Sequence, residues 1–231
     1  MKLILRFCLL LLLIWTSSCS QTKHREVDSP VFHPKKRISK LNPPIIVIDP
    51  GHGGQDTGAH SQENQYQEKH LTLATAMMLK KHLEYFGYRV VMTRKRDVYI
   101  QLNKRAQIAN HRRNSLFISL HFNSAPNRKA QGIEIFYYAP NYNHNKNRAQ
   151  HSKDFAQSVL SETIRYTKAP SRGIKCGNFL VIRKTEIPAI LLEGGFLTNK
   201  EELRKLKNPK YLNRLAWGVA RGVEHYFNSE I

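Results

Sequence analysis

The chain has 231 residues, of which 41% are hydrophobic, so it can bury the core of one domain of ordinary size. A formal net charge of +20 at pH 7, from 37 basic and 17 acidic side chains, favours an anionic lipid surface or polymer as a neighbour, or a solvated basic face. The sequence has no helix-turn-helix, zinc-finger or RNP-like pattern, so we predict no nucleic-acid partner.

Residues 1–20 have the features of an export signal. An apolar run at 7–15 follows two basic residues and leads through small residues to Cys19. The run is shorter than the roughly 20 apolar residues that span a bilayer, so we expect cleavage and not permanent anchoring by this segment. Two fates of Cys19 stay open, acylation as in a bacterial lipoprotein or cleavage without it, because Thr16 stands where a lipobox usually has leucine. We therefore expect an exported protein of the periplasm or cell envelope.

Residues 21–44 mix charge, proline and polar side chains without apolar periodicity, which indicates a basic linker. Its lysines and arginine at 35–40 could touch phospholipid headgroups, although a solvated linker is the simpler account. The remaining residues, 45–231, are predicted to form a single catalytic domain. Cys176 is the only cysteine in this part of the chain, so the domain has no internal disulfide, and we interpret Cys176 as a small structural thiol.

From residue 45 onward, short apolar runs alternate with segments of helical periodicity. The expected strands cover 45–48, 88–93, 116–121, 133–138, 179–182 and 188–192. The expected helices cover 69–86, 102–110 and 151–166, with a last helix that begins at Asn208-Pro209. Strands that alternate with helices predict an α/β fold, a three-layer sandwich in which helices flank a mostly parallel twisted sheet.

Four polar residues stand at the ends of these predicted elements. His52 follows the first strand, Glu68 begins the first helix, and His121 and Glu193 end the 116–121 and 188–192 strands. Singly, each has an ordinary structural explanation, such as a turn histidine or a charge at a helix N-terminus. Because ligands usually bind beyond the carboxyl ends of parallel strands, we expect the four to meet at one edge. Two imidazoles and a carboxylate form the ligand set of a catalytic zinc ion, and Glu193 would then act as the base.

Competing motifs fail on particular residues. The glycines at 51–54 do not form a dinucleotide-binding pattern, because Asp56 occupies the place of the third glycine. No Lys-Ser/Thr pair completes a phosphate loop, and the sequence has no HExxH motif. Cys176 lacks a neighbouring base among Lys175 and Gly177, which argues against a cysteine nucleophile.

Several motifs together resemble a known family. They are IVIDPGHGGQDTGA at 46–59, LNKRAQIAN at 102–110, LFISLHFNS at 116–124, RGIK at 172–175 and PAILLEGGFLTN at 188–199. In this order and spacing they are similar to the zinc-dependent N-acetylmuramoyl-L-alanine amidases of bacterial cell-wall turnover. The resemblance covers residues 45 to about 227.

The resemblance implies a role for each of the four polar residues. His52, Glu68 and His121 match the family's ligands for one zinc ion, and Glu193 matches its catalytic glutamate. The implied reaction is hydrolysis of the amide between N-acetylmuramic acid and L-alanine in peptidoglycan. It would release stem peptides during cell-wall remodelling or daughter-cell separation.

Three further residues have alternative explanations. Asn123 and Arg172 are candidates for substrate binding, yet either could equally be an architectural hydrogen-bonding group or an exposed charge. Asp49 is expected to brace the turn at Pro50-Gly51 or to orient His52, because metal-ligating histidines need a hydrogen-bond acceptor.

Other functions also remain open. A zinc peptidase that cuts within the stem peptide would use the same ligand set, and a noncatalytic cell-wall-binding module would carry a degenerate one. Some relatives have a helical insertion between the second histidine and the catalytic glutamate that blocks the zinc, whereas only 72 positions separate 121 from 193 here. We therefore expect a domain that needs no activator. We also expect the protein to be a monomer.

Overall fold

The computed structural model describes residues 43–61, 66–112, 114–140 and 146–229. The expected export signal, Cys19 and nearly all of the linker lie outside these residues. Within the described part of the chain, no helix is both long and apolar enough to cross a membrane.

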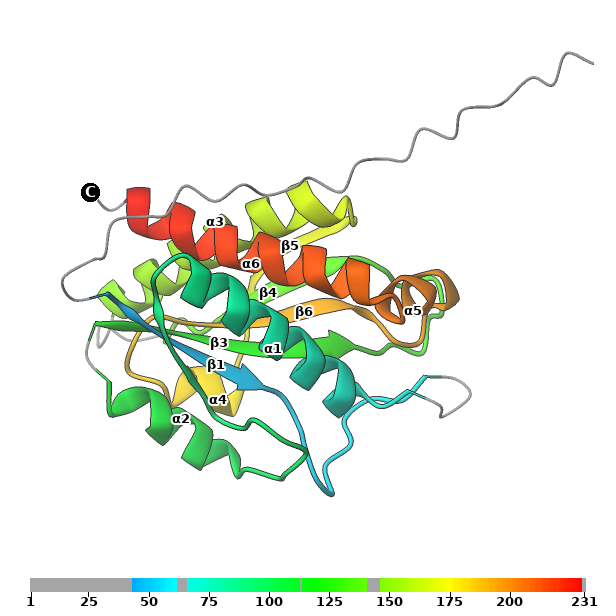
Figure 1. Ribbon diagram of the computed structural model, residues 1–231, viewed down its shortest axis with the longest axis horizontal. Helices are drawn as coiled ribbons and strands as arrows, with labels where there is room; N and C mark the ends of the chain where they lie inside the picture. The colour runs from blue at the N-terminus through cyan, green and yellow to red at the C-terminus, as the bar shows by residue number, and fades with distance from the viewer. Residues whose placement is uncertain (1–42, 62–65, 113, 141–145, 230–231) are drawn as a thin grey trace, which may run out of the picture. The chain divides into compact units, whose positions relative to one another are not determined.

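A six-stranded sheet forms the centre of the domain, in the order β2-β1-β3-β6-β4-β5 (Figure 1). The strands are β1 (Ile45–Pro50), β2 (Arg89–Met92), β3 (Ser115–Asn123), β4 (Ile133–Tyr137), β5 (Ser171–Cys176) and β6 (Ala189–Phe196). All neighbouring strands run parallel except β4 and β6, which pair antiparallel. The prediction of a mostly parallel sheet is confirmed.

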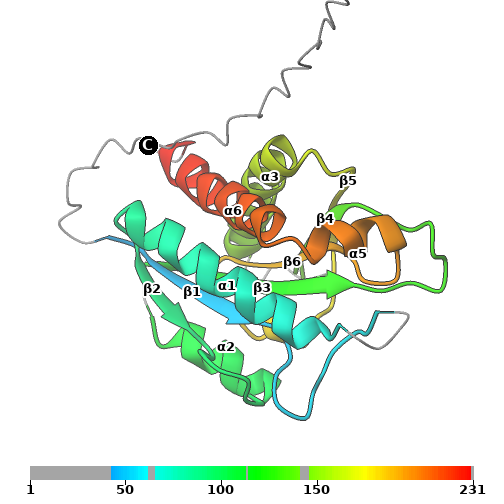
Figure 2. The same ribbon diagram turned by 45° about the vertical axis from the view of Figure 1, so that its right-hand side comes forward.

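Helices cover both faces of this sheet. They are α1 (Glu68–Tyr85), α2 (Leu102–Asn110), α3 (Lys146–Thr167), α4 (Leu180–Arg183), α5 (Lys200–Leu206) and α6 (Pro209–Ser229). Figure 1 shows α1, α3 and α6 on one face and α2 and α4 on the other, and Figure 2 shows α2 again on the face opposite α1, α3 and α6. This arrangement confirms the three-layer α/β sandwich.

The two faces bury separate hydrophobic clusters. In β1, Ile46 and Ile48 belong to the larger cluster under α1, α3 and α6, whereas Val47 belongs to the smaller cluster under α2 and α4. Side chains of a strand alternate between its faces, so a strand covered on both sides needs apolar residues at every position. This explains the continuous apolar run at 45–48.

One predicted strand is wrong and two elements were missed. Residues 179–182 form no strand, because Leu180–Arg183 is the single-turn helix α4, which buries Val181 and Ile182 against the smaller cluster. A run of four apolar residues fits a strand and a buried helical turn equally well. Strand β5 was missed because it lies at the sheet edge and is largely exposed, and α5 because its sequence KEELRKL is mostly charged.

Candidate metal centre and catalytic cleft

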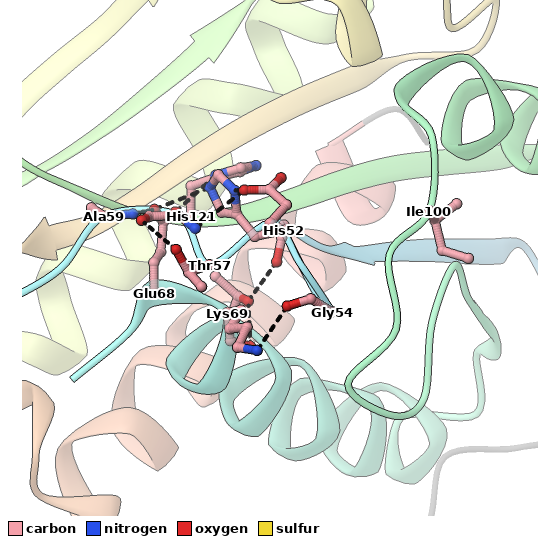
Figure 3. Close-up of polar contacts among 12 residues, drawn as sticks. His52, Gly54, Thr57, Ala59, Glu68, Lys69, Ile100 and His121 are labelled. Carbon is pink, nitrogen blue, oxygen red and sulfur yellow. Dashed lines mark hydrogen bonds and ion pairs between the residues drawn. The ribbon is translucent and has the colours of Figure 1, made fainter. Parts of the chain in front are cut away.

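The three ligand candidates meet at the carboxyl ends of β1 and β3 (Figure 3). His52 Nε2 lies 3.0 Å from Glu68 Oε2, and His121 Nδ1 lies 2.9 Å from Glu68 Oε1. One nitrogen or oxygen atom from each residue lies within 4.8 Å of the others, as a shared metal ion requires. The prediction that these distant residues converge is confirmed.

His52 is oriented by Asp56, a residue that the sequence did not single out for this role. The imidazole Nδ1 lies 2.8 Å from Asp56 Oδ1, which leaves Nε2 directed toward Glu68. A carboxylate that accepts from one ring nitrogen fixes the tautomer and frees the other nitrogen for a metal ion. The short spacing within GHGGQD is the signal that could have found Asp56.

Asp49 acts on the turn after β1 and has no hydrogen bond to His52. Its carboxylate accepts hydrogen bonds from the side chains of Thr93, Arg105 and Ser119. Arg105 is 1% exposed and also donates to the carbonyl oxygens of Pro50 and His52, each at 2.8 Å. Of the two roles expected for Asp49, bracing the turn agrees with these contacts. Asp49 binds Arg105, and Arg105 in turn binds the backbone of the turn.

Two glycines at the site leave room for its own side chains. A Cβ atom at Gly51 would lie 2.3 Å from His121 Cε1, and one at Gly58 would lie 2.6 Å from Glu68 Oε2. The backbone of Gly58 also has a φ of +67°, which favours glycine. At Gly51 the space that a side chain would take is filled by the imidazole of His121.

The electrostatics of the three ligand candidates favour a charged carboxylate. Burial alone would raise the pKa of Glu68, but hydrogen bonds from His121 and His52 outweigh burial and hold this pKa well below its usual range. Burial would likewise lower the pKa of both histidines, but the hydrogen bond and charge of Glu68 raise each above its ordinary value. Glu68 is therefore ionised and ready to bind a cation.

Glu193 lies within β6, directly opposite His121 on β3 and Glu134 on β4. Its Oε2 atom is buried and has no hydrogen-bond partner among the described residues. Burial raises the pKa of Glu193 to about 7, and the charges of Glu68 and Glu134 add to this effect while His121 and His52 oppose it. A carboxyl group with a pKa near neutrality and an unused oxygen is suited to accept and return a proton.

A cleft of about 420 Å³ contains the three ligand candidates and Glu193. Part of its lining is apolar and comes from α2 and the α4 region, through Leu102, Phe179, Leu180 and Val181. Another part is polar and comes from the end of β3, through Asn123 and Ser124. The cleft can therefore hold a ligand with both apolar and hydrogen-bonding groups.

The two candidates for substrate binding differ in position. Asn123 lines the cleft, whereas Arg172 on β5 is absent from the lining residues. Arg172 Nε donates to Glu134 Oε2 at 2.9 Å, and its guanidinium lies 4.9 Å from the ring centre of Phe196. Asn123 Nδ2 donates to Glu134 Oε1 at 2.7 Å, so both residues bind the same buried carboxylate. Sequence reasoning did not select Glu134, the one charged residue of the strand expected at 133–138.

Cys176 is a free and exposed thiol at the end of β5. It therefore fills no space in the core, which corrects its interpretation as a structural residue. Among the described residues its sulfur has one polar contact, 3.9 Å from the carbonyl oxygen of Ala139.

Comparison with known proteins identifies the class of hydrolase that this site defines. The model of the N-acetylmuramoyl-L-alanine amidase family, Amidase_3, matches residues 46–225. The chain therefore belongs to the N-acetylmuramoyl-L-alanine amidase family.

Named relatives support the same assignment. The chain is 36% identical over 189 residues to the sporulation-specific N-acetylmuramoyl-L-alanine amidase of Bacillus subtilis, covering 79% of this chain and 68% of that protein. It is 31% identical over 204 residues to the germination-specific amidase of the same species, covering 82% of each. The crystal structure of an N-acetylmuramoyl-L-alanine amidase from Clostridium difficile matches with a TM-score of 0.76 at 39% identity, covering 82% of this chain and all of that chain.

Proposed function

We propose that this protein is a zinc-dependent hydrolase that cleaves the amide between N-acetylmuramic acid and L-alanine in peptidoglycan. The observation that carries the proposal is the meeting of His52, Glu68 and His121 with the unpartnered oxygen of Glu193 in one cleft. Membership of the amidase family supports the choice of the scissile bond.

The donor set fits a zinc ion. Two imidazole nitrogens and one carboxylate oxygen are ligands of catalytic zinc sites, in which a fourth position stays open. When bound, zinc would supply a Lewis acid that acidifies water and polarises the amide carbonyl. Asp56 would hold the His52 ring in the orientation that this requires, and Arg105 would hold the backbone on which His52 stands.

Glu193 is the residue to which we assign the proton transfers. In this assignment its carboxylate takes a proton from the attacking water and then gives it to the nitrogen of the leaving L-alanine. The same carboxyl group can serve in both steps because a group with a pKa of about 7 both accepts and releases a proton readily near neutral pH. The apolar part of the cleft lining would exclude competing water around these groups.

Substrate contacts are assigned separately from the chemistry. Asn123 lines the cleft and is proposed to donate a hydrogen bond to the substrate. Arg172 is held by Glu134 outside the lining, so a substrate contact of Arg172 would require a part of the peptidoglycan that extends beyond the cleft.

Digestion of purified peptidoglycan tests the proposed reaction. A chelator should abolish the release of stem peptides, and added zinc should restore it. Mass spectra should then show free N-terminal L-alanine on the peptides and intact lactyl groups on the glycan. Products cut within the stem, with the lactyl-alanine bond intact, would support the alternative zinc peptidase, and the absence of any cleavage would support a noncatalytic wall-binding module.

We also propose an exported monomer that acts in the periplasm or cell envelope without an activator. Lipidated Cys19 or the basic linker would provide membrane contact. Cell-wall relatives such as the probable cell wall amidase LytH of Staphylococcus epidermidis support this location. One solved amidase, CwlD from Clostridioides difficile, is in complex with the GerS lipoprotein. Activity of the purified protein alone on sacculi tests whether this chain needs such a partner.

A further inference from the structure

Glu134 is a buried carboxylate that belongs neither to the ligand set nor to the cleft lining. It is 4% exposed and stands on β4 directly opposite Glu193, in a row that continues across β6 to His121 on β3. A buried charge is costly unless it is paired, so its partners indicate what it does.

The partners of Glu134 divide between its two carboxylate oxygens. Oε2 accepts from Arg172 at 2.9 Å and from the ammonium group of Lys175. Oε1 accepts from Asn123 Nδ2 at 2.7 Å. The two cations balance the buried charge, and their hydrogen bonds hold the pKa of Glu134 below its ordinary value even though burial opposes this. Glu134 is thus ionised and can only accept hydrogen bonds.

An acceptor at this position determines which way the Asn123 amide points. The nitrogen of Asn123 must face Glu134, and the oxygen then accepts from the backbone N–H of Ser124 at 2.8 Å. Among the described residues, Nδ2 donates only to Glu134, so its second hydrogen remains available. Asn123 and Glu193 both line the cleft, so a ligand held there can reach this hydrogen.

We propose that Glu134 is a positioning residue that orients the Asn123 amide to donate a hydrogen bond to a carbonyl oxygen of the substrate. The proposal rests on the function proposed above and specifies the hydrogen-bond donor that this site offers. Arg172 and Lys175 act in the same unit by keeping Glu134 ionised.

The substitution Glu134→Gln tests this proposal because it should reverse the orientation of the Asn123 amide. The single remaining oxygen of glutamine will be taken by the two cations, so its NH2 group faces Asn123. Asn123 must then turn over and present its oxygen to Gln and to the cleft. We expect kcat/KM to fall about tenfold, as for the loss of one hydrogen bond, with the same split between kcat and KM as in Asn123→Ala.

A double-variant cycle on a soluble disaccharide-peptide substrate separates positioning from general structural support. If Glu134 acts through Asn123, the variant carrying both Asn123→Ala and Glu134→Gln should be no slower than Asn123→Ala alone, within about twofold, with unchanged metal content. Effects that multiply, to about a hundredfold, would overturn the proposal, as would wild-type turnover in Glu134→Gln.

Glu202 supplies a matched control. It is 3% exposed and accepts hydrogen bonds from the backbone N–H groups of Gly132 and Phe196, and among the described residues no hydrogen bond joins its side chain to Asn123. The effects of Glu202→Gln and Asn123→Ala on kcat/KM should therefore multiply.

Should Glu134→Gln fail to fold, Glu134→Asp takes its place in the cycle, because the shorter side chain withdraws the carboxylate oxygen from Asn123 by one methylene. Failure of the proposed function is distinguishable, because the wild-type protein itself would then leave the lactyl-alanine bond intact.

Discussion

Each of the three ligand candidates is hydrogen-bonded to another side chain, whereas Glu193 keeps one buried oxygen without a partner among the described residues. The cleft thus has a ligand side, formed by His52, Glu68 and His121, and a base side, formed by Glu193. The two sides have different chemical requirements. Metal ligands must be held in a fixed orientation, and hydrogen bonds provide this. A base must keep a lone pair available, and the burial that raises the pKa of Glu193 to about 7 also leaves one of its oxygens without a partner among the described residues.

The largest expected effect lies on the base side. Glu193→Gln keeps the shape of the side chain but cannot accept the proton, so turnover should fall about 10²–10⁴-fold. Because Glu193 is outside the ligand set, metal content measured by elemental analysis should stay at the wild-type level. Loss of metal together with turnover would contradict the division between the two sides.

On the ligand side, the strongest effect is expected at Arg105. Arg105→Met leaves the carboxylate of Asp49 buried without its cation and removes one hydrogen bond from each of the carbonyl groups of Pro50 and His52. We expect the free energy of unfolding to fall by about 3–5 kcal/mol, measured by denaturant titration. Lys104 is exposed on the same helix, so Lys104→Met should change stability by less than about 0.5 kcal/mol. Equal effects of the two substitutions on the free energy of unfolding would show that the contacts of Arg105 do not stabilise the fold.

The pH dependence of the metal-free protein tests the pairing around Glu68. His52 and His121 have raised pKa values and Glu68 has a lowered one, so their pairing stabilises the folded state fully between about pH 4.5 and pH 6.5. This contribution is lost as pH rises through the folded pKa values of the histidines, and also as pH falls toward that of Glu68. Glu68→Gln should therefore cost about 1.5–3 kcal/mol at pH 6 and less at pH 8.5. Metal binding should show the opposite trend, because it requires neutral imidazoles. A cost that does not change with pH would contradict the pairing.

The smallest expected effect on the ligand side comes from Asp56. Asp56→Ala leaves His52 in place but removes the acceptor at Nδ1, so metal affinity should weaken about 10–100-fold. Competition with a chelating dye measures this change. Asp154→Ala, an exposed acidic residue on α3, provides the control and should leave the affinity unchanged. An unchanged affinity in Asp56→Ala would mean that His52 is oriented by its backbone alone.

The same comparison explains what the sequence could predict. His52, His121 and Glu193 each follow or interrupt an apolar strand, and the rule that parallel strands end at one edge was enough to bring them together. Asp56 and Arg105 were not predicted in their roles, because their partners lie in a turn whose path depends on tertiary contacts. Glu134 was missed because alternation within one strand cannot show that both faces of the sheet are covered.

The antiparallel pairing of β4 with β6 has a consequence for how this enzyme can vary. Because side chains alternate strictly along a strand, a slip of β4 by one residue would turn Glu134 to the opposite face and place Ile133 or Ile135 opposite Glu193. The connection at 124–132 can thus gain or lose residues, provided that the register of β4 is kept. Homologues with different loops before β4 should preserve the Glu–Glu pairing, which makes register and not loop length the quantity to compare among them.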